Sequence, residues 1–171
     1  DQINVPIYTT RLTRGLLEVK LSRGGQLSKA QLNTVQADDV INIGPFQVEF
    51  FHVCHSIPDG VSLGIQTPAG LIIHMSDYKF DHTPVDNWPT DYGKLAELAK
   101  RGVLALLSDS TNADKPGWTP SERVIDPAFD EVFRTAPGRI IIASFASLIS
   151  RIQQVADAAS RHNRKLAIAG A

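Results

Sequence analysis

The sequence predicts an α/β fold, because segments typical of strands alternate with segments of helical spacing along most of its 171 residues. Short apolar runs rich in β-branched residues indicate the strands, and regularly spaced leucines, isoleucines and alanines indicate the helices. Hydrophobic residues make up 43% of the chain and charged residues 20%, which is close to the average for globular domains. This composition excludes disordered, collagen-like and coiled-coil proteins.

The first two thirds of the chain contain most of the expected strands. Two turns support this assignment: Gly44-Pro45 separates one pair of strand-like segments, and Pro68-Ala69-Gly70 predicts a hairpin between the next two. The short apolar run over residues 103–107 is typical of a strand buried on both faces. We expect strands at residues 5–8, 40–44, 46–53, 61–67, 71–75 and 103–107, and helices at 10–21 and 92–100.

The last third of the chain has a different rhythm. Residues 109–120 are polar and contain glycine and prolines, so we expect a loop there and a domain boundary near residues 112–121. The pattern beyond it predicts a helix at 127–134, a strand at 139–143, a helix at 148–162 and a strand at 165–169. A strand, a helix and a strand in that order predict a right-handed βαβ unit with a parallel pair.

Three polar residues follow apolar strands directly, at the points where the chain enters loops. They are His55, Asp77 and Asp109. Binding sites in α/β folds gather at such strand ends, and imidazole with carboxylates suits a metal ion that activates water. The alternative is three unrelated loop residues, and composition and periodicity do not decide between these two interpretations.

Other features bound the possible functions. Cys54 is the single cysteine of the sequence, so no internal disulfide forms, and its strand position predicts a small core residue. The net charge of −1 gives no nucleic-acid signature, so RNA or DNA binding must come from a local patch. No stretch approaches the about 18 apolar residues of a membrane span, and the first residues have neither the basic start nor the apolar run of a signal peptide. We therefore expect a soluble, cytoplasmic protein without a membrane partner.

Four motifs occur in order along the chain. They are Phe50-Phe51 with His55-Ser56-Ile57-Pro58-Asp59, His74-Met75-Ser76-Asp77-Tyr78-Lys79, Leu107-Ser108-Asp109-Ser110-Thr111-Asn112, and Phe145-Ala146-Ser147 with Arg151-Ile152-Gln153-Gln154. In residue types and order these motifs resemble those of the ribonuclease J family, in the β-CASP branch of the metallo-β-lactamase superfamily. The resemblance covers essentially the whole chain.

The resemblance implies a partial metallo-β-lactamase αββα sandwich over residues 1–115, followed by the first βαβ part of a β-CASP domain over 116–171. It also implies that the full-length protein is a zinc-dependent ribonuclease with two zinc ions and RNA as its substrate. The full-length protein is expected to be a homo-oligomer. His55 matches a metal ligand, Asp77 a metal-bridging ligand with a catalytic role, and Asp109 a catalytic acid. Ser147 and Arg151 match the RNA path, although Arg151 is equally compatible with a solvated helix face.

The chain also departs from the family pattern. The family's His-x-His-x-Asp-His motif is absent, so the resemblance implies an internal fragment that is inactive alone. Met75-Ser76 replaces the usual Thr-Gly, which affects the turn that aims Asp77 because serine resists angles that glycine permits. Leu148 and Ser150 replace an asparagine and a histidine.

Two other functions remain open at this point. One is a different hydrolase of the metallo-β-lactamase fold, such as a DNA-processing nuclease or a lactonase. The other is a catalytically inactive RNA-binding module that keeps the fold. The resemblance leaves endonuclease and 5′-3′ exonuclease activity equally possible.

Overall fold

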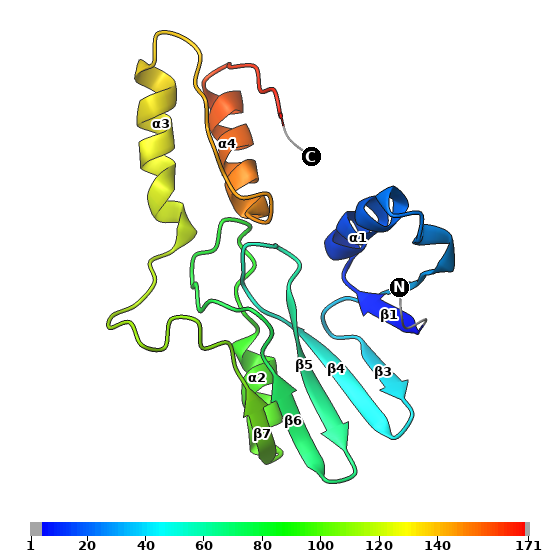
Figure 1. Cartoon of the computed structure of the whole chain (residues 1–171). Helices are drawn as coiled ribbons and strands as arrows, with labels where there is room; N and C mark the ends of the chain where they lie inside the picture. The colour runs from blue at the N-terminus through cyan, green and yellow to red at the C-terminus, as the bar shows by residue number, and fades with distance from the viewer. Residues whose placement is uncertain (1–4, 170–171) are drawn as a thin grey trace.

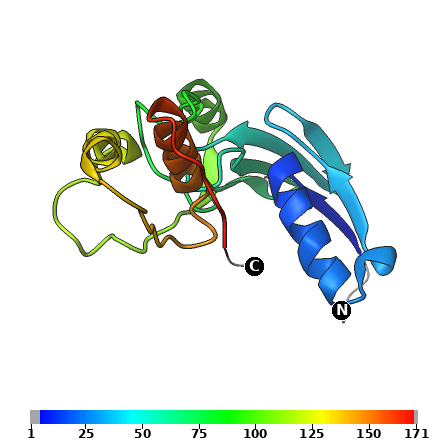
Figure 2. The ribbon, with the colours of Figure 1, turned by 90° about the horizontal axis from the view of Figure 1, so that it is seen from above.

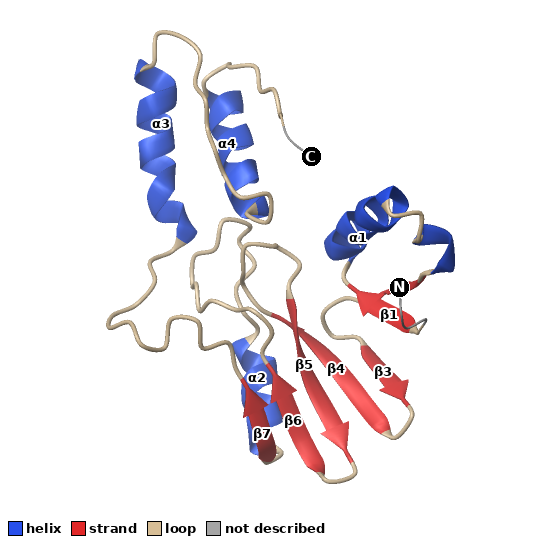
Figure 3. Cartoon of the chain, viewed as in Figure 1, coloured by secondary structure: helices blue, strands red, loops and turns tan. Residues whose placement is uncertain are grey.

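The computed structural model of the chain describes residues 5–169, which form two sheets, four α-helices and two 3-10 helices (Figures 1 and 3). The elements in chain order are β1 (Pro6–Thr9), α1 (Arg11–Arg23), the 3-10 helix η1 (Leu27–Lys29), β2 (Gln31–Thr34), β3 (Val40–Ile43), β4 (Phe46–His52), β5 (Val61–Thr67), β6 (Gly70–His74), α2 (Tyr92–Lys100), β7 (Val103–Leu107), the 3-10 helix η2 (Glu122–Ile125), α3 (Asp126–Thr135) and α4 (Ile149–Arg161).

Strands β3 to β7 form the main sheet, in the order β3-β4-β5-β6-β7. The neighbours are antiparallel from β3 to β6, and β7 joins β6 in parallel after the crossover through α2. Strands β1 and β2 pair in parallel as a separate ribbon. The predicted hairpins at 40–53 and 61–75 are therefore confirmed. Strand β2 was not predicted, because Gln31-Leu32-Asn33-Thr34 lacks an apolar pattern.

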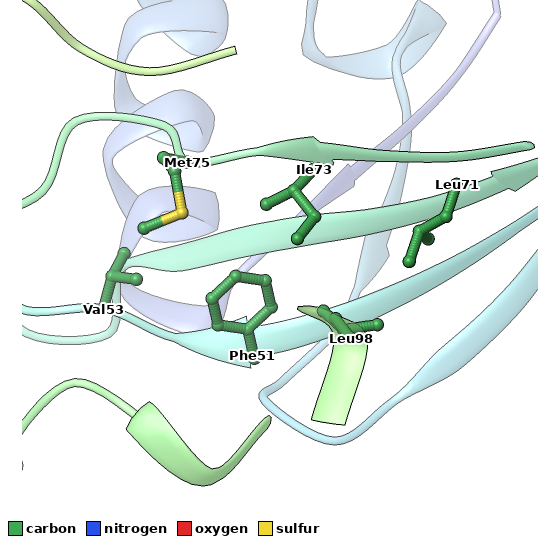
Figure 4. Packing of buried hydrophobic residues seen from close by; sticks show 6 residues of the cluster. All are labelled: Phe51, Val53, Leu71, Ile73, Met75 and Leu98. Atoms are coloured by element: carbon green, nitrogen blue, oxygen red, sulfur yellow. The ribbon is translucent and has the colours of Figure 1, made fainter. Parts of the chain in front are cut away.

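Helix α2 covers one face of the main sheet. Asp91 starts the helix, because its Oδ1 accepts a hydrogen bond from the Lys94 backbone N–H at 2.8 Å. Leu98 is fully buried and packs onto residues of β4 and β6, as Figure 4 shows. The core cluster on this face consists of Phe51, Val53, Leu71, Ile73, Met75 and Leu98.

The opposite face of the main sheet carries a second cluster and a wide cavity. Val35, Val48 and Phe50 are buried in this cluster. Figure 2 shows α1 on this side of the sheet and α2 on the other. A cavity of about 970 Å³ separates the region of α1 from the sheet, and its lining includes His55 and Asp77.

Helices α3 and α4 pack against each other and bury their own apolar cluster. Phe133 of α3 meets Val155, Ala158 and Ala159 of α4. The guanidinium of Arg164 closes this pair, because its Nε donates to the Phe133 carbonyl at 2.9 Å. This cluster is separate from both clusters of the main sheet.

The predicted βαβ unit is only partly correct. Helix α4 forms as expected, whereas residues 139–143 and 165–169 have no strand structure. Parallel strands need apolar cover on both faces, and here the helix pair covers one side only. Ile141 is 89% exposed and Ile168 is 79% exposed, which shows that this cover is missing in the described part of the chain.

The expectation of a doubly buried strand at 103–107 is wrong as well. All five residues of β7 are exposed, with Leu104 and Leu106 each 61% exposed, because β7 lies at the edge of the main sheet. An exposed segment, residues 108–120, then connects β7 to η2. Within residues 5–169, no helix has the length and apolar character needed to cross a membrane.

A cluster of charged side chains holds helix α2 in place on the main sheet. The carboxylate of Glu49 on β4 contacts Lys94 Nζ at 2.8 Å and also pairs with the Arg101 guanidinium. Burial raises the pKa of Glu49, but the hydrogen bonds and charges of Lys94 and Arg101 outweigh it and hold the pKa below its usual value. Glu49 therefore stabilises the fold as a carboxylate.

Replacing Glu49 with glutamine is expected to destabilise the chain by about 1–3 kcal/mol at pH 7, because it removes the charge that balances Lys94 and Arg101. The lowered folded pKa means that this contribution is complete above the usual pKa of 4.5 and is lost as the pH falls through the folded value. Urea unfolding at pH 7 and pH 3 measures both effects. Glu18→Gln, in an exposed pair with Arg14, is the control and should change little.

The exposed apolar side of β7 predicts self-association of the isolated chain. Unpaired edge strands with apolar residues are templates for pairing with another chain. Light scattering should show oligomers at micromolar concentrations, and Leu106→Lys should shift the distribution toward monomer. A monodisperse monomer of the unaltered chain would contradict this expectation.

Candidate functional site

His55, Asp77 and Asp109 line one cavity of about 370 Å³, although they lie far apart in the sequence. Each follows the end of a strand of the main sheet: β4, β6 and β7, respectively. The three side chains are exposed, so they are accessible to a ligand. The prediction that these strand ends come together is confirmed by this arrangement, while the chemical roles of the residues stay predictions.

His55 lies in the loop that follows β4. The Val53 backbone N–H donates to the Gly60 carbonyl at 3.1 Å, which closes this loop at its base. The ring Nδ1 of His55 lies 3.2 Å from the Ser56 hydroxyl. Nε2 is therefore the ring nitrogen available to a metal ion or substrate, with Nδ1 oriented by its neighbour.

The turn that aims Asp77 contains a serine in a left-handed conformation. Ser76 has φ of +56°, a region that non-glycine residues seldom adopt. Two hydrogen bonds hold it there: Ser76 Oγ donates to the Val61 carbonyl at 2.9 Å, and its backbone N–H donates to His74 Nδ1 at 3.2 Å. Serine at position 76 therefore strains the backbone of this turn, as the sequence predicts, and the two hydrogen bonds offset the strain.

Asp109 is held as an anion at the end of β7. Thr111 donates to its Oδ1 from the hydroxyl at 2.6 Å and from the backbone at 2.9 Å. These bonds, together with the nearby His55, keep the pKa of Asp109 below its usual value. The Ser108 hydroxyl meets the Tyr78 hydroxyl at 3.0 Å, which ties this strand end to the loop of Asp77.

Neither of the two residues predicted to contact RNA lines the cavity with a free side chain. Ser147 is exposed in the loop before α4 and is not part of the cavity lining. The guanidinium of Arg151 already pairs with the carboxylate of Glu122 and donates to Gln154 Oε1 at 3.0 Å. A phosphate contact from Arg151 would have to compete with these bonds.

Three residues complete the cavity wall from the helical side: Glu122, Leu148 and Ser150. The sequence singled out Leu148 and Ser150 as departures from the family pattern, whereas it did not single out Glu122. The hydroxyl of Ser150 is buried and has no hydrogen-bond partner among the residues that the structure describes. For Glu122, the available signal was Ser121 before it, a residue type that starts helical turns; the Ser121 hydroxyl indeed accepts from Arg123 N–H at 3.3 Å.

The donor set for zinc is incomplete in this chain. Imidazole nitrogen and carboxylate oxygen are ordinary zinc ligands, so His55 and Asp77 fit as two members of a site. Across residues 5–169, no group of three or more His, Cys, Asp and Glu side chains is placed to hold a metal ion. A complete site therefore needs further ligands from elsewhere.

Comparison with known sequences identifies similar proteins. A family model described as the beta-CASP domain of ribonuclease J matches residues 137–171. The chain is 45% identical to ribonuclease J of Helicobacter pylori strain J99 over 170 residues, which are 99% of the chain and 25% of that protein. It is 44% identical to ribonuclease J2 of Bacillus subtilis strain 168, covering 99% of the chain and 31% of that protein.

The same relationship holds with ribonuclease J of Thermus thermophilus, at 45% identity over 97% of the chain and 29% of that protein. The chain thus spans about a quarter to a third of the length of these relatives. Among solved structures, a protein of unknown function from Enterococcus faecalis V583 has a TM-score of 0.67, with 20% identity over 90% of this chain and 39% of that one. At this identity, the likeness supports the fold alone.

The isolated chain is expected to bind zinc weakly. Two protein ligands leave most of the coordination sphere to water, whereas stable protein sites use at least three protein ligands. Calorimetric titration with zinc should show no tight step, and His55→Ala should change the isotherm little. Stoichiometric, tight binding of two zinc ions would contradict this expectation.

Proposed function

Because this chain is a homologue of the ribonuclease J proteins over 99% of its length, we propose that the full-length protein is a metal-dependent ribonuclease. It hydrolyses RNA phosphodiester bonds internally or from the 5′ end, in RNA processing and decay. The observation that carries this proposal is the meeting of His55, Asp77 and Asp109 at one cavity. Three strands of the main sheet deliver these residues, each at its carboxyl end.

In this proposal, His55 and Asp77 hold metal ions and Asp109 supports the site. Bound zinc supplies a Lewis acid and a water of lowered pKa. The strand ends and the Ser76 turn hold the two ligands in place, and the Thr111 hydrogen bonds keep Asp109 ionised. A carboxylate beside such a centre orients a ligating histidine or the attacking water.

RNA is the substrate in this proposal, and the assembled protein is a homo-oligomer. The helical side of the cavity contributes Leu148 and Ser150, so the substrate would enter between the main sheet and the start of α4. RNA cleavage by the full-length protein, with and without a chelator, tests the proposal. Cleavage that is lost with chelator and restored by zinc supports it, and RNA binding without cleavage supports the inactive module instead.

The proposed roles predict an order of severity for alanine substitutions in the full-length protein. Asp77→Ala and His55→Ala remove metal ligands, so cleavage should fall by several orders of magnitude while the fold survives. Asp109→Ala removes a supporting group and should cost about 10–100-fold. Single-turnover rates and zinc content, measured on the same samples, give both readouts.

Cys54→Ala is the matched control for this series. Cys54 is buried next to His55, its thiol donates to the Trp88 carbonyl at 3.2 Å, and burial raises the pKa of the thiol, so this proposal gives it no role in the chemistry. The RNA cleavage rate of the Cys54→Ala protein should stay near that of the unaltered protein. An Asp77→Ala protein with full zinc content and normal rates would eliminate the proposed metal role.

A further inference from the structure

Three consecutive residues, 121–123, attach the helix pair to the loop that follows β6. We call them the clasp. Each residue of the clasp bonds a different point of that loop: Ser121 Oγ donates to the Thr83 carbonyl at 2.9 Å, the Glu122 backbone N–H donates to Asp81 Oδ2 at 3.3 Å, and Arg123 Nε donates to the Pro84 carbonyl at 2.9 Å. The same loop contains Asp77 near its start.

Glu122 is the member of the clasp that contacts both the loop after β6 and helix α4. Its carboxylate lies 3.3 Å from Nζ of Lys79, two residues beyond Asp77, and pairs with the guanidinium of Arg151 in the first turn of α4. Its backbone carbonyl accepts a hydrogen bond from Gln154 Nε2 at 3.0 Å. One side chain thus joins the loop of a proposed metal ligand to the helix on the other side of the cavity.

The ion pairs of Glu122 are half-buried. The Lys79 and Arg151 side chains are 17% and 20% exposed, and the Glu122 side chain is 34% exposed. Burial raises the pKa of Glu122, but the Arg151 hydrogen bond and the Lys79 charge outweigh it and keep the pKa below its usual value. Glu122 is therefore a carboxylate at neutral pH, able to hold both cations.

The position of α4 depends on such polar contacts, because its apolar cluster is shared with α3 and not with the main sheet. At the start of α4, the Ser150 backbone N–H donates to the Ser56 carbonyl at 3.3 Å. Ser56 is the neighbour that contacts His55 Nδ1. A shift of α4 therefore changes the distance between the helical wall of the cavity and His55.

We propose that Glu122 is a positioning residue: by holding Lys79 and Arg151 together, it sets the helical wall of the cavity, including Leu148 and Ser150, against His55 and Asp77. This inference rests on the proposed ribonuclease function for its activity readout only. Glu122 acts through its two partners and leaves the chemical step to the residues at the strand ends.

The test is Glu122→Gln in the full-length protein, which keeps the shape of the side chain and removes its charge. The RNA concentration for half-maximal single-turnover cleavage should rise roughly 10- to 100-fold, with a smaller change in the maximal rate and full zinc content. Hydrogen exchange at the Ser150 amide should accelerate. Glu131→Gln, in an exposed pair with Arg134 on α3, is the matched control and should change none of these readouts.

Partner variants separate positioning from general stability. Arg151→Lys keeps a cation near Glu122 and should retain part of the RNA affinity that Arg151→Gln loses. Arg151→Gln should match Glu122→Gln, and the double variant with both glutamines should be little worse than either one. Unchanged half-maximal concentration and unchanged Ser150 exchange in Glu122→Gln would overturn the proposal. A lowered unfolding midpoint or zinc loss that accounts for the whole defect would overturn it as well.

The exchange measurement keeps this inference separate from the proposed function. If the unaltered protein fails to cleave RNA, the ribonuclease proposal fails, and the Ser150 amide still reports whether Glu122 holds α4 in place. Accelerated exchange confined to the start of α4 and to residues 53–60 would then support the positioning role. Equal exchange rates of the Ser150 amide in Glu122→Gln and in the unaltered protein would refute it.

Discussion

Strand β4 is the element on which the main sheet depends, because it carries apolar residues toward both faces. Phe51 lies in the cluster beneath α2, and Phe50 lies in the cluster on the other face. A slip by one residue would exchange these two phenylalanines with little apolar loss, so they do not define the register alone. Glu49 defines it, because a slip would carry its carboxylate away from Lys94 and Arg101 and onto an apolar face. The register in turn fixes where the chain leaves β4 and delivers His55.

The sequence was sufficient for elements whose stabilising contacts are local. The Pro68-Ala69-Gly70 turn and the alternation on either side of it place β5 and β6 correctly, since a hairpin needs only its own two strands. It was insufficient where a strand depends on partners far along the chain. Residues 139–143 have the apolar composition of a buried strand, yet without a paired neighbour Ile141 stays exposed. Periodicity indicates which face is apolar and not what covers it.

In the candidate site, too, some residues could be predicted from the sequence and others could not. His55, Asp77 and Asp109 were predictable because each follows a strand directly, and strand ends of one sheet share an edge. Glu122 was not, because its importance comes from Lys79 and Arg151, which lie 43 and 29 residues away and carry no common pattern with it. The three residues thus follow the ends of sheet strands, while charged pairs of Glu122 hold the opposite wall of the cavity. Such a wall can be repositioned without disturbing the two apolar clusters of the main sheet.

The exposed segment at residues 108–120 is anchored at both ends, by the Ser108–Tyr78 contact on one side and by Ser121–Thr83 on the other. The entropy cost of closing a flexible loop grows only slowly with its length, by about 0.6 kcal/mol per doubling. Extra sequence at Pro116-Gly117, well away from both anchors, would therefore cost the fold little. This makes the segment the natural place for lineage-specific insertions in evolution, and for a reporter domain in the laboratory.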